Sequence, residues 1–225
     1  MCRGCRPTAE PEPAALYAAA VPLDPARTVA ELRELRELTG DENGAQRVAW
    51  TPVWTQAKEW FAAKLADLPL AYEVDEAGNQ WWTLPGASER AVLMGGHIDS
   101  VPNGGWLDGC LNIVAAAEVL RRIAGEGTPP VTVRLVNWAD EEGARFGRSL
   151  FGSSAAAGSM ADQDELRELS DRDGVALPDA LREHGVELDG ALDARSQLAT
   201  AAAYLELHIE PVSYTHLTLP TTPYV

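Results

Sequence analysis

The chain has 225 residues, of which 46% are hydrophobic, so it can bury a core as one large domain or as a domain with a fragment of another. It carries 34 acidic and 18 basic residues and a formal net charge of −16. This balance argues against nucleic acid and anionic membranes as partners, because both require basic surfaces. The composition fits the acidic, solvated surface of an enzyme.

Three cysteines are too few for a disulfide framework, and no apolar run reaches the roughly 18 residues of a membrane-spanning helix. Cys2 and Cys5 form a lone C-x-x-C pair without a second pair or a nearby histidine, which is a weak zinc signal. We expect Cys110 to pack in the core. Residues 1–23 are rich in Pro and Ala and predict a loose leader rather than a signal peptide, so we expect a cytoplasmic protein.

Two amphipathic helices are predicted at the start of the domain, each with a capping residue before a proline. "DPARTVAELRELREL" has Asp24 as the cap and Pro25 at the first helical position. "TPVWTQAKEWFAAKLADL" has Thr51 as the cap, followed by Pro52. The residues expected to face the interior are Val29, Leu32, Leu35 and Leu38 in the first helix and Ala57, Trp60, Phe61 and Leu65 in the second.

Strands and a helix follow in alternation. Short strands are predicted from Leu70 to Val74, from Gln80 to Leu84 and from Ala91 to Gly95, each bounded by Gly, Pro or Asp. A helix from about Leu111 to Ala124 leads into Val131 to Ala139, a β-rich run typical of a strand buried on both faces.

Helical segments are expected again near Ser149 to Gly158 and within 162–185, and "AAYLELHIE" returns to strand character. Crossovers through helices favour parallel neighbouring strands. The order therefore predicts an α/β protein, a three-layer α/β/α sandwich with a mixed sheet.

The domain boundaries follow from changes in composition. We assign residues 24–210 to one folded domain. Residues 211–225, "PVSYTHLTLPTTPYV", lack an apolar period, and we interpret them as a non-native tail; a disordered tail or a β-hairpin is the alternative. His216 lies in this tail and is given no role.

Glycines surround an imidazole and two carboxylates in "GGHIDSVPNGGWLDG", where His97 and Asp99 precede Asp108. Burying unpaired charged groups is costly unless a partner or a metal offsets the cost, so this segment indicates a metal site. His97 comes just past a predicted strand, and Asp99 is placed to hold the free ring N–H of His97. The glycines expected to permit a turn around Asp108 are Gly104, Gly105 and Gly109.

Two further segments are expected to join this site. "NWADEEGARFG" places Glu141 and Glu142 directly after a strand, and "LELHIE" carries His208 on the last strand. Sites in open α/β sheets assemble at the carboxyl ends of strands. Imidazole and carboxylate groups suit Zn²⁺ and related ions, and a carboxylate such as Asp108 can bridge two ions about 3.5 to 4 Å apart. Adjacent glutamates point apart on an extended backbone, so one is expected to bind metal and the other to transfer protons.

Each element alone has a simpler interpretation. An H-x-D loop more often places polar side chains in solvent. Two glutamates at a helix start usually interact favourably with the helix dipole, and a histidine on a strand is usually hydrogen-bonded within the protein or exposed. We expect His184 in "LREHGVE" to be such a histidine, on an exposed helix end. The combined order and the glycine setting favour the metal site.

The segments "GGHIDSVPNGGWLDG", "NWADEEGARFG" and "LELHIE" resemble the metal-dependent amidases of the M20 metallopeptidase superfamily. The resemblance is to the N-carbamoyl-L-amino acid hydrolase, allantoate amidohydrolase and β-ureidopropionase group, and it runs from about residue 24 to 210. It implies that His97 and His208 hold one metal, Asp108 bridges, Glu142 binds the other metal, Glu141 is the general base and Asp99 is the orienting carboxylate.

The resemblance further implies two divalent ions, which the ligand types allow to be zinc, manganese, cobalt or nickel. It implies a small-molecule ureido substrate, hydrolysis of the ureido C–N bond of N-carbamoyl amino acids or allantoate, and a homodimer at full length. His208 in place of an acidic ligand favours this amidase branch over the carboxypeptidase-like members.

Pro211 and Val212 stand where the family continues with Gln-Gly, and the family's lid domain and last histidine ligand are not in this sequence. The resemblance therefore implies that residues 24–210 are an incomplete catalytic metallohydrolase domain, and we expect the chain to be an N-terminal part of a longer enzyme and inactive alone. An M20 aminoacylase or dipeptidase is one alternative function. A non-catalytic metal-binding fragment is the other.

Overall fold

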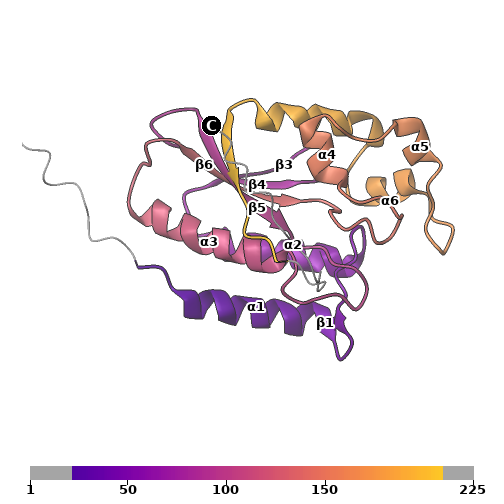
Figure 1. Ribbon diagram of the computed structural model, residues 1–225, viewed down its shortest axis with the longest axis horizontal. Helices are drawn as coiled ribbons and strands as arrows, with labels where there is room; N and C mark the ends of the chain where they lie inside the picture. The colour runs from indigo at the N-terminus through magenta and orange to yellow at the C-terminus, as the bar shows by residue number, and fades with distance from the viewer. Residues whose placement is uncertain (1–21, 210–225) are drawn as a thin grey trace, which may run out of the picture.

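The computed structural model describes residues 22–209 and is built around a five-stranded mixed sheet (Figure 1). Its strands are β3 (Ala71–Val74), β4 (Gln80–Leu84), β5 (Ala91–His97), β6 (Thr132–Trp138) and β7 (Ala201–Leu205), and a separate ribbon contains β1 (Gly40–Asp41) and β2 (Gly44–Ala45). The order across the sheet is β3-β4-β6-β5-β7. Because β5 runs parallel to both β6 and β7, the carboxyl ends of these three strands lie along one edge of the sheet.

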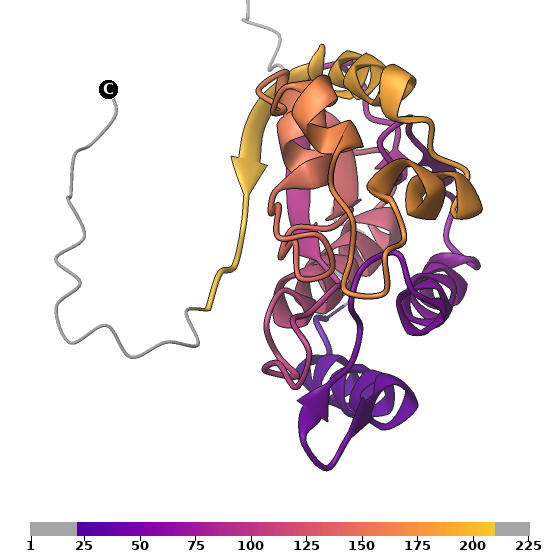
Figure 2. The same ribbon diagram turned by 90° about the vertical axis from the view of Figure 1, so that its right-hand side faces the viewer.

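Helices cover both faces of the sheet (Figures 1 and 2). They are α1 (Pro25–Thr39), α2 (Pro52–Leu65), α3 (Cys110–Gly125), α4 (Phe151–Ala157), α5 (Gln163–Arg167), α6 (Leu177–Glu183) and the 3₁₀ helix η1 (Leu188–Leu198). On one face, α3 packs against β5 and β6 and is itself contacted by α1. On the other face, Ala156 of α4 and Leu198 of η1 cover Trp81 and Trp138. This arrangement confirms the predicted three-layer sandwich.

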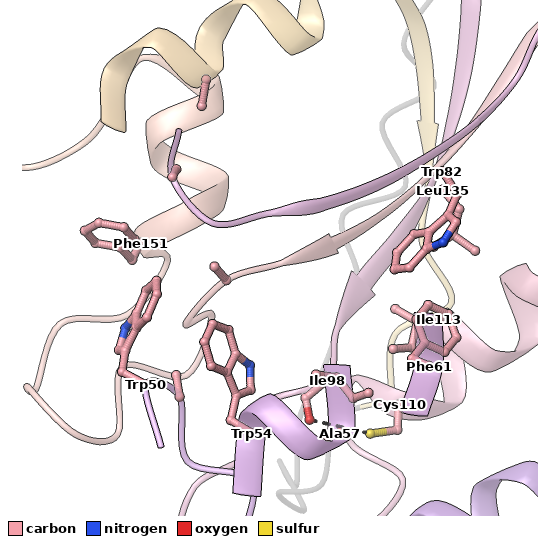
Figure 3. Packing of buried hydrophobic residues seen from close by; sticks show 14 of the residues in the cluster. Trp50, Trp54, Ala57, Phe61, Trp82, Ile98, Cys110, Ile113, Leu135 and Phe151 are labelled. Atoms are coloured by element: carbon pink, nitrogen blue, oxygen red, sulfur yellow. Dashed lines mark hydrogen bonds between the residues drawn. The ribbon is translucent and has the colours of Figure 1, made fainter. Parts of the chain in front are cut away.

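The strands alternate their side chains between two hydrophobic clusters, because successive strand residues point to opposite faces. Trp82 and Leu135 join the large cluster that includes α2 and α3, as Figure 3 shows, whereas Trp81 and Val136 join the smaller cluster under α4. β6 is buried from Val133 to Trp138, which confirms the prediction of a strand covered on both faces.

Both predicted helix caps are present. The Asp24 carboxylate accepts a hydrogen bond of 3.0 Å from the backbone N–H of Arg27, and the Thr51 hydroxyl accepts one of 3.4 Å from Trp54. Each bond satisfies one of the backbone donors that a helix leaves open at its start, which is worth about 1 kcal/mol in typical cases.

The prediction of which residues of α1 face the interior is partly wrong. Leu32 and Leu35 are buried, but Val29 is 44% and Leu38 is 39% exposed. Helix α1 lies on α2 and α3 rather than directly on the sheet, so its buried stripe is narrow and includes the charged residue Glu31. In α2, the prediction is confirmed for Ala57, Phe61 and Leu65, while Trp60 is only half-buried and donates its indole N–H to the exposed Glu34.

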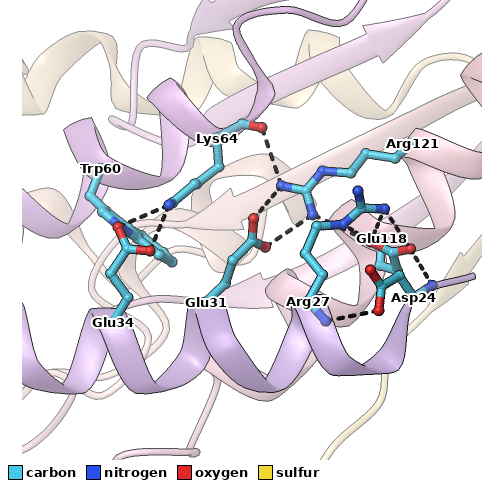
Figure 4. Close-up of polar contacts among 8 residues, drawn as sticks. All are labelled: Asp24, Arg27, Glu31, Glu34, Trp60, Lys64, Glu118 and Arg121. Atoms are coloured by element: carbon cyan, nitrogen blue, oxygen red, sulfur yellow. Dashed lines mark hydrogen bonds and ion pairs between the residues drawn. The ribbon is translucent and has the colours of Figure 1, made fainter.

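Ion pairs join the three helices of this layer (Figure 4). Glu118 of α3 accepts hydrogen bonds of 2.7 and 2.8 Å from the guanidinium of Arg27, and Glu31 accepts bonds of 2.8 and 3.0 Å from Arg121. The side chains of Glu118 and Glu31 are 5% and 10% exposed, so arginines compensate the cost of their burial. Charge pairs, in addition to apolar contacts, fix α1 against α3.

Several boundaries differ from the predictions. His97 is the last residue of β5 rather than a residue past the strand, and β7 ends at Leu205, so His208 follows that strand instead of lying on it. Helix η1 was not expected. The interpretation of residues 1–23 falls almost entirely, and that of 211–225 entirely, outside the described residues. In the part of the chain that the structure describes, no helix is long and apolar enough to cross a membrane.

His184 ends α6 as expected, but it is half-buried rather than exposed. Its ring lies 5.8 Å from the Trp50 ring and 5.5 Å from the Trp54 ring, and its Nδ1 atom is 3.3 Å from the Thr55 hydroxyl. Aromatic packing across α2 and α6 covers it, a contact between distant segments that its own sequence neighbours do not indicate. Cys110 is fully buried, as expected.

Candidate metal centre

Three of the predicted metal ligands converge at the edge where β5 and β6 end. His97 closes β5, Glu142 lies in the turn after β6, and Asp108 lies in the turn before α3. One ligand atom from each of these side chains lies within 4.8 Å of the others, and among residues 22–209 this is the group of His, Cys, Asp and Glu that could hold a metal ion. The structure thus brings together residues separated by up to 45 positions in the sequence.

Gly109 allows Asp108 to approach His97. Its φ is +62°, which disfavours other residues, and an added Cβ would lie 2.5 Å from Cε1 of His97 and still closer to the His97 carbonyl oxygen. The same expectation is wrong for Gly105, where a Cβ would make an ordinary contact with Asp108 at 3.8 Å. Gly104 is sterically required as well, because a Cβ there would lie 2.9 Å from the backbone carbonyl oxygen of Val101. The expectation therefore holds for Gly104 and Gly109, of which Gly109 is the one beside the imidazole.

Asp99 is fully buried and contacts both parts of the centre. Its backbone carbonyl lies 3.1 Å and its Oδ1 atom 3.5 Å from Nδ1 of His97, so it contacts the imidazole, and its orienting role stays a prediction. Its carboxylate also accepts hydrogen bonds from the backbone N–H groups of Glu141 at 3.3 Å and Glu142 at 3.0 Å. This second contact was not predicted, and it couples the position of the imidazole to that of both glutamates.

Carboxylates dominate the electrostatics of the centre. Burial alone lowers the pKa of His97, but Asp99, Glu142 and Glu141 outweigh burial and raise it to about 9. Burial raises the pKa of Glu142, and the neighbouring Asp108 raises it further because two adjacent carboxylates repel. One imidazole and two close carboxylates form a donor set suited to divalent metal ions, and a cation would relieve the repulsion between the carboxylates.

Glu141 and Glu142 have different partners, as the sequence predicts for neighbouring residues. The Oε2 atom of Glu141 accepts a hydrogen bond of 2.7 Å from the hydroxyl of Ser153 on α4, whereas Glu142 lies in the group with His97 and Asp108. Burial raises the pKa of Glu141, while Ser153 and His97 act in the opposite direction. Glu141 is therefore a half-buried carboxylate outside the potential ligand group and beside it.

Asp140 supports the turn that presents these glutamates, and sequence reasoning missed it. Its Oδ2 atom accepts a bond of 2.8 Å from the Trp50 indole, and its Oδ1 atom accepts one of 3.1 Å from the backbone N–H of Gly143. Its φ is +54°. Burial, with help from Asp99, raises the pKa of Asp140 to about 7. The signal in the sequence that could have identified Asp140 is its position directly before the two glutamates in "NWADEEG".

His208 is exposed and is not in the close group of potential ligands. The segment that carries it is nevertheless attached beside the centre, because the backbone N–H of Leu207 donates a bond of 3.1 Å to Asn112 of α3. The Asn112 amide in turn donates to the carbonyl of Gly95 in β5. The charge of Glu206 also acts on Glu141. The assignment of His208 as a ligand stays a prediction, and Asn112 is a positioning residue that the sequence did not reveal.

A histidine and acidic side chains gathered at the carboxyl ends of sheet strands define this protein as an α/β protein with a candidate metal centre. Residues 93–220 match the model of peptidase family M20/M25/M40, which is metal-dependent. The match covers more than half of the chain, so the chain belongs to this family.

The chain is 36% identical over 185 residues to an N-carbamoyl-L-amino acid amidohydrolase of Geobacillus stearothermophilus, with 80% of this chain and 44% of the relative covered. It is 35% identical over 171 residues to the allantoate amidohydrolase of Escherichia coli, with 74% and 41% covered. A hydantoinase/carbamoylase family amidase from Burkholderia ambifaria shares the fold with a TM-score of 0.70 and 29% identity over 84% of this chain and 46% of that one. The chain thus spans less than half the length of these relatives.

Proposed function

We propose that this chain carries the metal-binding part of an amidohydrolase that cleaves the ureido C–N bond of N-carbamoyl amino acids or allantoate. One observation carries the proposal: His97, Asp108 and Glu142 converge, with Glu141 beside them, in a chain similar to amidohydrolases with these substrates in their names. An acidic group with few basic partners is suited to holding cations rather than to stabilising the fold.

We assign His97, Asp108 and Glu142 as ligands and His208 as a further ligand to the ion that His97 binds. Asp108 would be the carboxylate ligand that the two proposed ions share. Two divalent ions are proposed, and imidazole and carboxylate ligands suit zinc, manganese, cobalt or nickel. Such ions polarise a substrate carbonyl and make water a better nucleophile near neutral pH.

Glu141 is proposed as the general base. Its carboxylate accepts a proton from the attacking water and delivers it to the nitrogen that leaves, so that the C–N bond breaks with a neutral amine as the product. The Ser153 hydroxyl, 2.7 Å from Oε2 of Glu141, fixes the direction of that carboxylate. Asp99 holds the imidazole of His97 and the backbone of both glutamates, which keeps the base at a constant place relative to the ligands.

The substrate is tested on the product of the complete open reading frame, because the chain spans 44% of the first relative. Ammonia release is measured from N-carbamoyl-L-amino acids, N-carbamoyl-β-alanine and allantoate, with manganese, zinc or cobalt supplied. A panel of dipeptides and N-acetyl amino acids serves as the control. Turnover of a ureido substrate with little turnover of dipeptides is expected, and a preference for dipeptides would contradict the amidase assignment.

The 225-residue chain tests the binding role separately. We expect it to bind divalent metal in a titration followed by elemental analysis and to release no ammonia alone. Activity of this chain by itself would contradict the proposal that it is only part of the enzyme. A homodimer and a cytoplasmic location remain part of the proposal; the first rests on the resemblance, and the second on the low cysteine content and the leader composition.

A further inference from the structure

Arg47 lies between β2 and α2, and its side chain is fully buried. Its guanidinium keeps a positive charge at every pH at which proteins fold. Among residues 22–209, its side-chain hydrogen-bond acceptors are the Ile98 carbonyl at 2.7 Å from Nε, the Cys110 Sγ atom at 2.9 Å from Nη2 and the Thr39 hydroxyl at 3.4 Å from Nη1. None of these acceptors is a carboxylate. Because burying a charge without a counter-charge is costly, stabilisation of the fold alone does not explain this group.

Two of these contacts lie directly beside the candidate metal centre. Ile98 stands between His97 and Asp99 in the sequence, and Cys110 comes two residues after Asp108. The Sγ atom of Cys110 is in turn 3.8 Å from the carbonyl oxygen of Ile98 (Figure 3). The guanidinium therefore connects the end of β5, which supplies His97, to the start of α3, which follows Asp108.

The backbone of Arg47 is attached to the same loop. Its N–H donates a bond of 3.1 Å to the Ser100 hydroxyl, and its carbonyl accepts one of 3.0 Å from the backbone N–H of Ser100. Two residues earlier, Ala45 and Gly104 exchange backbone hydrogen bonds of 3.0 and 3.2 Å. Since the backbone is held on this loop, the planar guanidinium has little freedom to change its distance from its acceptors.

We propose that Arg47 is a positioning residue of the metal centre, whose guanidinium sets the spacing between His97 at the end of β5 and Asp108 before α3. This inference rests on the proposed function, in which both side chains bind metal. The rigid fork of an arginine donates to Ile98 from Nε and to Cys110 from Nη2 at the same time, whereas the ammonium of a lysine is a single point on a flexible stem. Loss of a group that orients metal ligands typically weakens metal binding by about 10- to 100-fold.

The test measures manganese binding to the folded 225-residue chain and to its variants. Manganese suits carboxylate ligands better than thiolates, so it disfavours binding at the C-x-x-C pair. Arg47→Lys keeps the charge but not the fork, and it should raise the dissociation constant by about 10- to 100-fold. Free manganese is measured by electron paramagnetic resonance at a temperature at which circular dichroism shows each variant to be folded. An unchanged dissociation constant would overturn the proposal.

Arg134 of β6 provides the matched control, because it is a buried arginine whose contacts lie away from the metal centre. Its Nε atom donates to the Thr83 hydroxyl at 3.1 Å, and its Nη1 atom donates to the Gln197 carbonyl at 2.6 Å. Arg134→Lys should lower the free energy of unfolding and leave the dissociation constant for manganese unchanged. Equal weakening in Arg47→Lys and Arg134→Lys would show that a general loosening of the fold, rather than the position of Arg47, weakens metal binding.

A milder variant decides the question if Arg47→Lys does not fold. Cys110→Ala removes the acceptor of Nη2 at the start of α3 and leaves the bond from Nε to the Ile98 carbonyl. Because half of the connection remains, this variant should bind manganese more weakly than the unchanged chain but more tightly than Arg47→Lys. An affinity equal to that of the unchanged chain would contradict the connection through α3.

Hydrogen exchange in the metal-free chain separates this inference from the proposed function. Peptide mass spectrometry should show faster backbone exchange within residues 97–110 in Arg47→Lys, whereas Arg134→Lys should affect peptides that contain Gln197 instead. If the unchanged chain bound no manganese, the proposed function would fail, and exchange within 97–110 would still decide the role of Arg47. Unchanged exchange in that segment would overturn the role.

Discussion

Two regions of this molecule gather buried or half-buried carboxylates, and they differ in the groups that those carboxylates face. In the layer of α1, α2 and α3, Glu118 and Glu31 each accept hydrogen bonds from an arginine at 2.7 to 3.0 Å (Figure 4). At the ends of β5 and β6, Asp108 and Glu142 face each other and share the single imidazole of His97. The first region is neutralised by its own side chains, whereas the second has an excess of negative charge.

The difference separates a charge network that stabilises the fold from one that we propose binds metal. Paired charges in the helix layer offset the cost of their burial and hold helices together. Carboxylates that lack such partners repel one another in the metal-free protein. A divalent cation that binds there relieves this repulsion, which strengthens its binding. Net charge does not distinguish these regions, since both contribute acidic residues to the total of −16.

The largest expected effect tests the division of roles within the acidic centre. In the product of the complete open reading frame, Glu141→Gln should lower turnover by on the order of 10² to 10⁴, the usual contribution of a general base, and should retain its metals. Glu142→Gln should instead lose metal. Steady-state kinetics and elemental analysis of both variants measure this, and the reverse pattern would show that the two roles are exchanged.

A second substitution breaks the network in the helix layer. Glu118→Gln should lower the free energy of unfolding by about 2–3 kcal/mol, less than the roughly 3–5 kcal/mol of a fully buried pair, because the Arg27 side chain stays 41% exposed. Urea denaturation of the 225-residue chain measures the change. The matched control is Glu34→Gln, whose partner pair with Lys64 is on the surface and should be worth about 0–1 kcal/mol. Similar losses in the two variants would remove the contrast between buried and surface pairs.

A Glu→Gln substitution in the acidic centre should raise the free energy of unfolding rather than lower it. In the metal-free 225-residue chain, Glu142→Gln removes a charge whose burial and repulsion from Asp108 outweigh its attraction to His97, so the free energy of unfolding should rise by up to about 1 kcal/mol. Added zinc or manganese should then stabilise the unchanged chain more than the variant. Thermal unfolding with and without metal checks both statements, and a destabilised metal-free variant would mean that Glu142 is a structural residue.

The smallest expected effect is on how stability depends on pH under acidic conditions. The pKa of Glu118 is lowered, since the bonds from Arg27 and from the backbone of Asp24 outweigh burial. Its contribution to stability is therefore complete above the unfolded pKa of about 4.3 and is lost as pH falls below that value toward the lowered pKa. Urea midpoints at about pH 6 and about pH 3.5 should differ less in Glu118→Gln than in the unchanged chain. An unchanged pH dependence would show that Glu118 does not titrate with folding.

Local patterns were sufficient to predict the strands of the main sheet and the α-helices, although not the short strands β1 and β2 or the 3₁₀ helix η1. The capping residues Asp24 and Thr51 and the β-rich run of β6 act over a few residues, so their effects can be predicted without knowing the rest of the chain. The motif around His97 likewise identified the convergence with Asp108 and Glu142, because the ends of parallel strands meet at one edge.

Contacts between distant segments were decided only by the tertiary structure. The exposure of Val29 and Leu38 depends on α1 lying over other helices, and the burial of His184 depends on two tryptophans of another segment. The same holds for the bond from Ser153 to Glu141 and for the hold of Asp99 on the glutamate backbone. Periodicity states which side of an element is apolar, but the partner of a polar atom is set by packing across the chain, which no local pattern encodes.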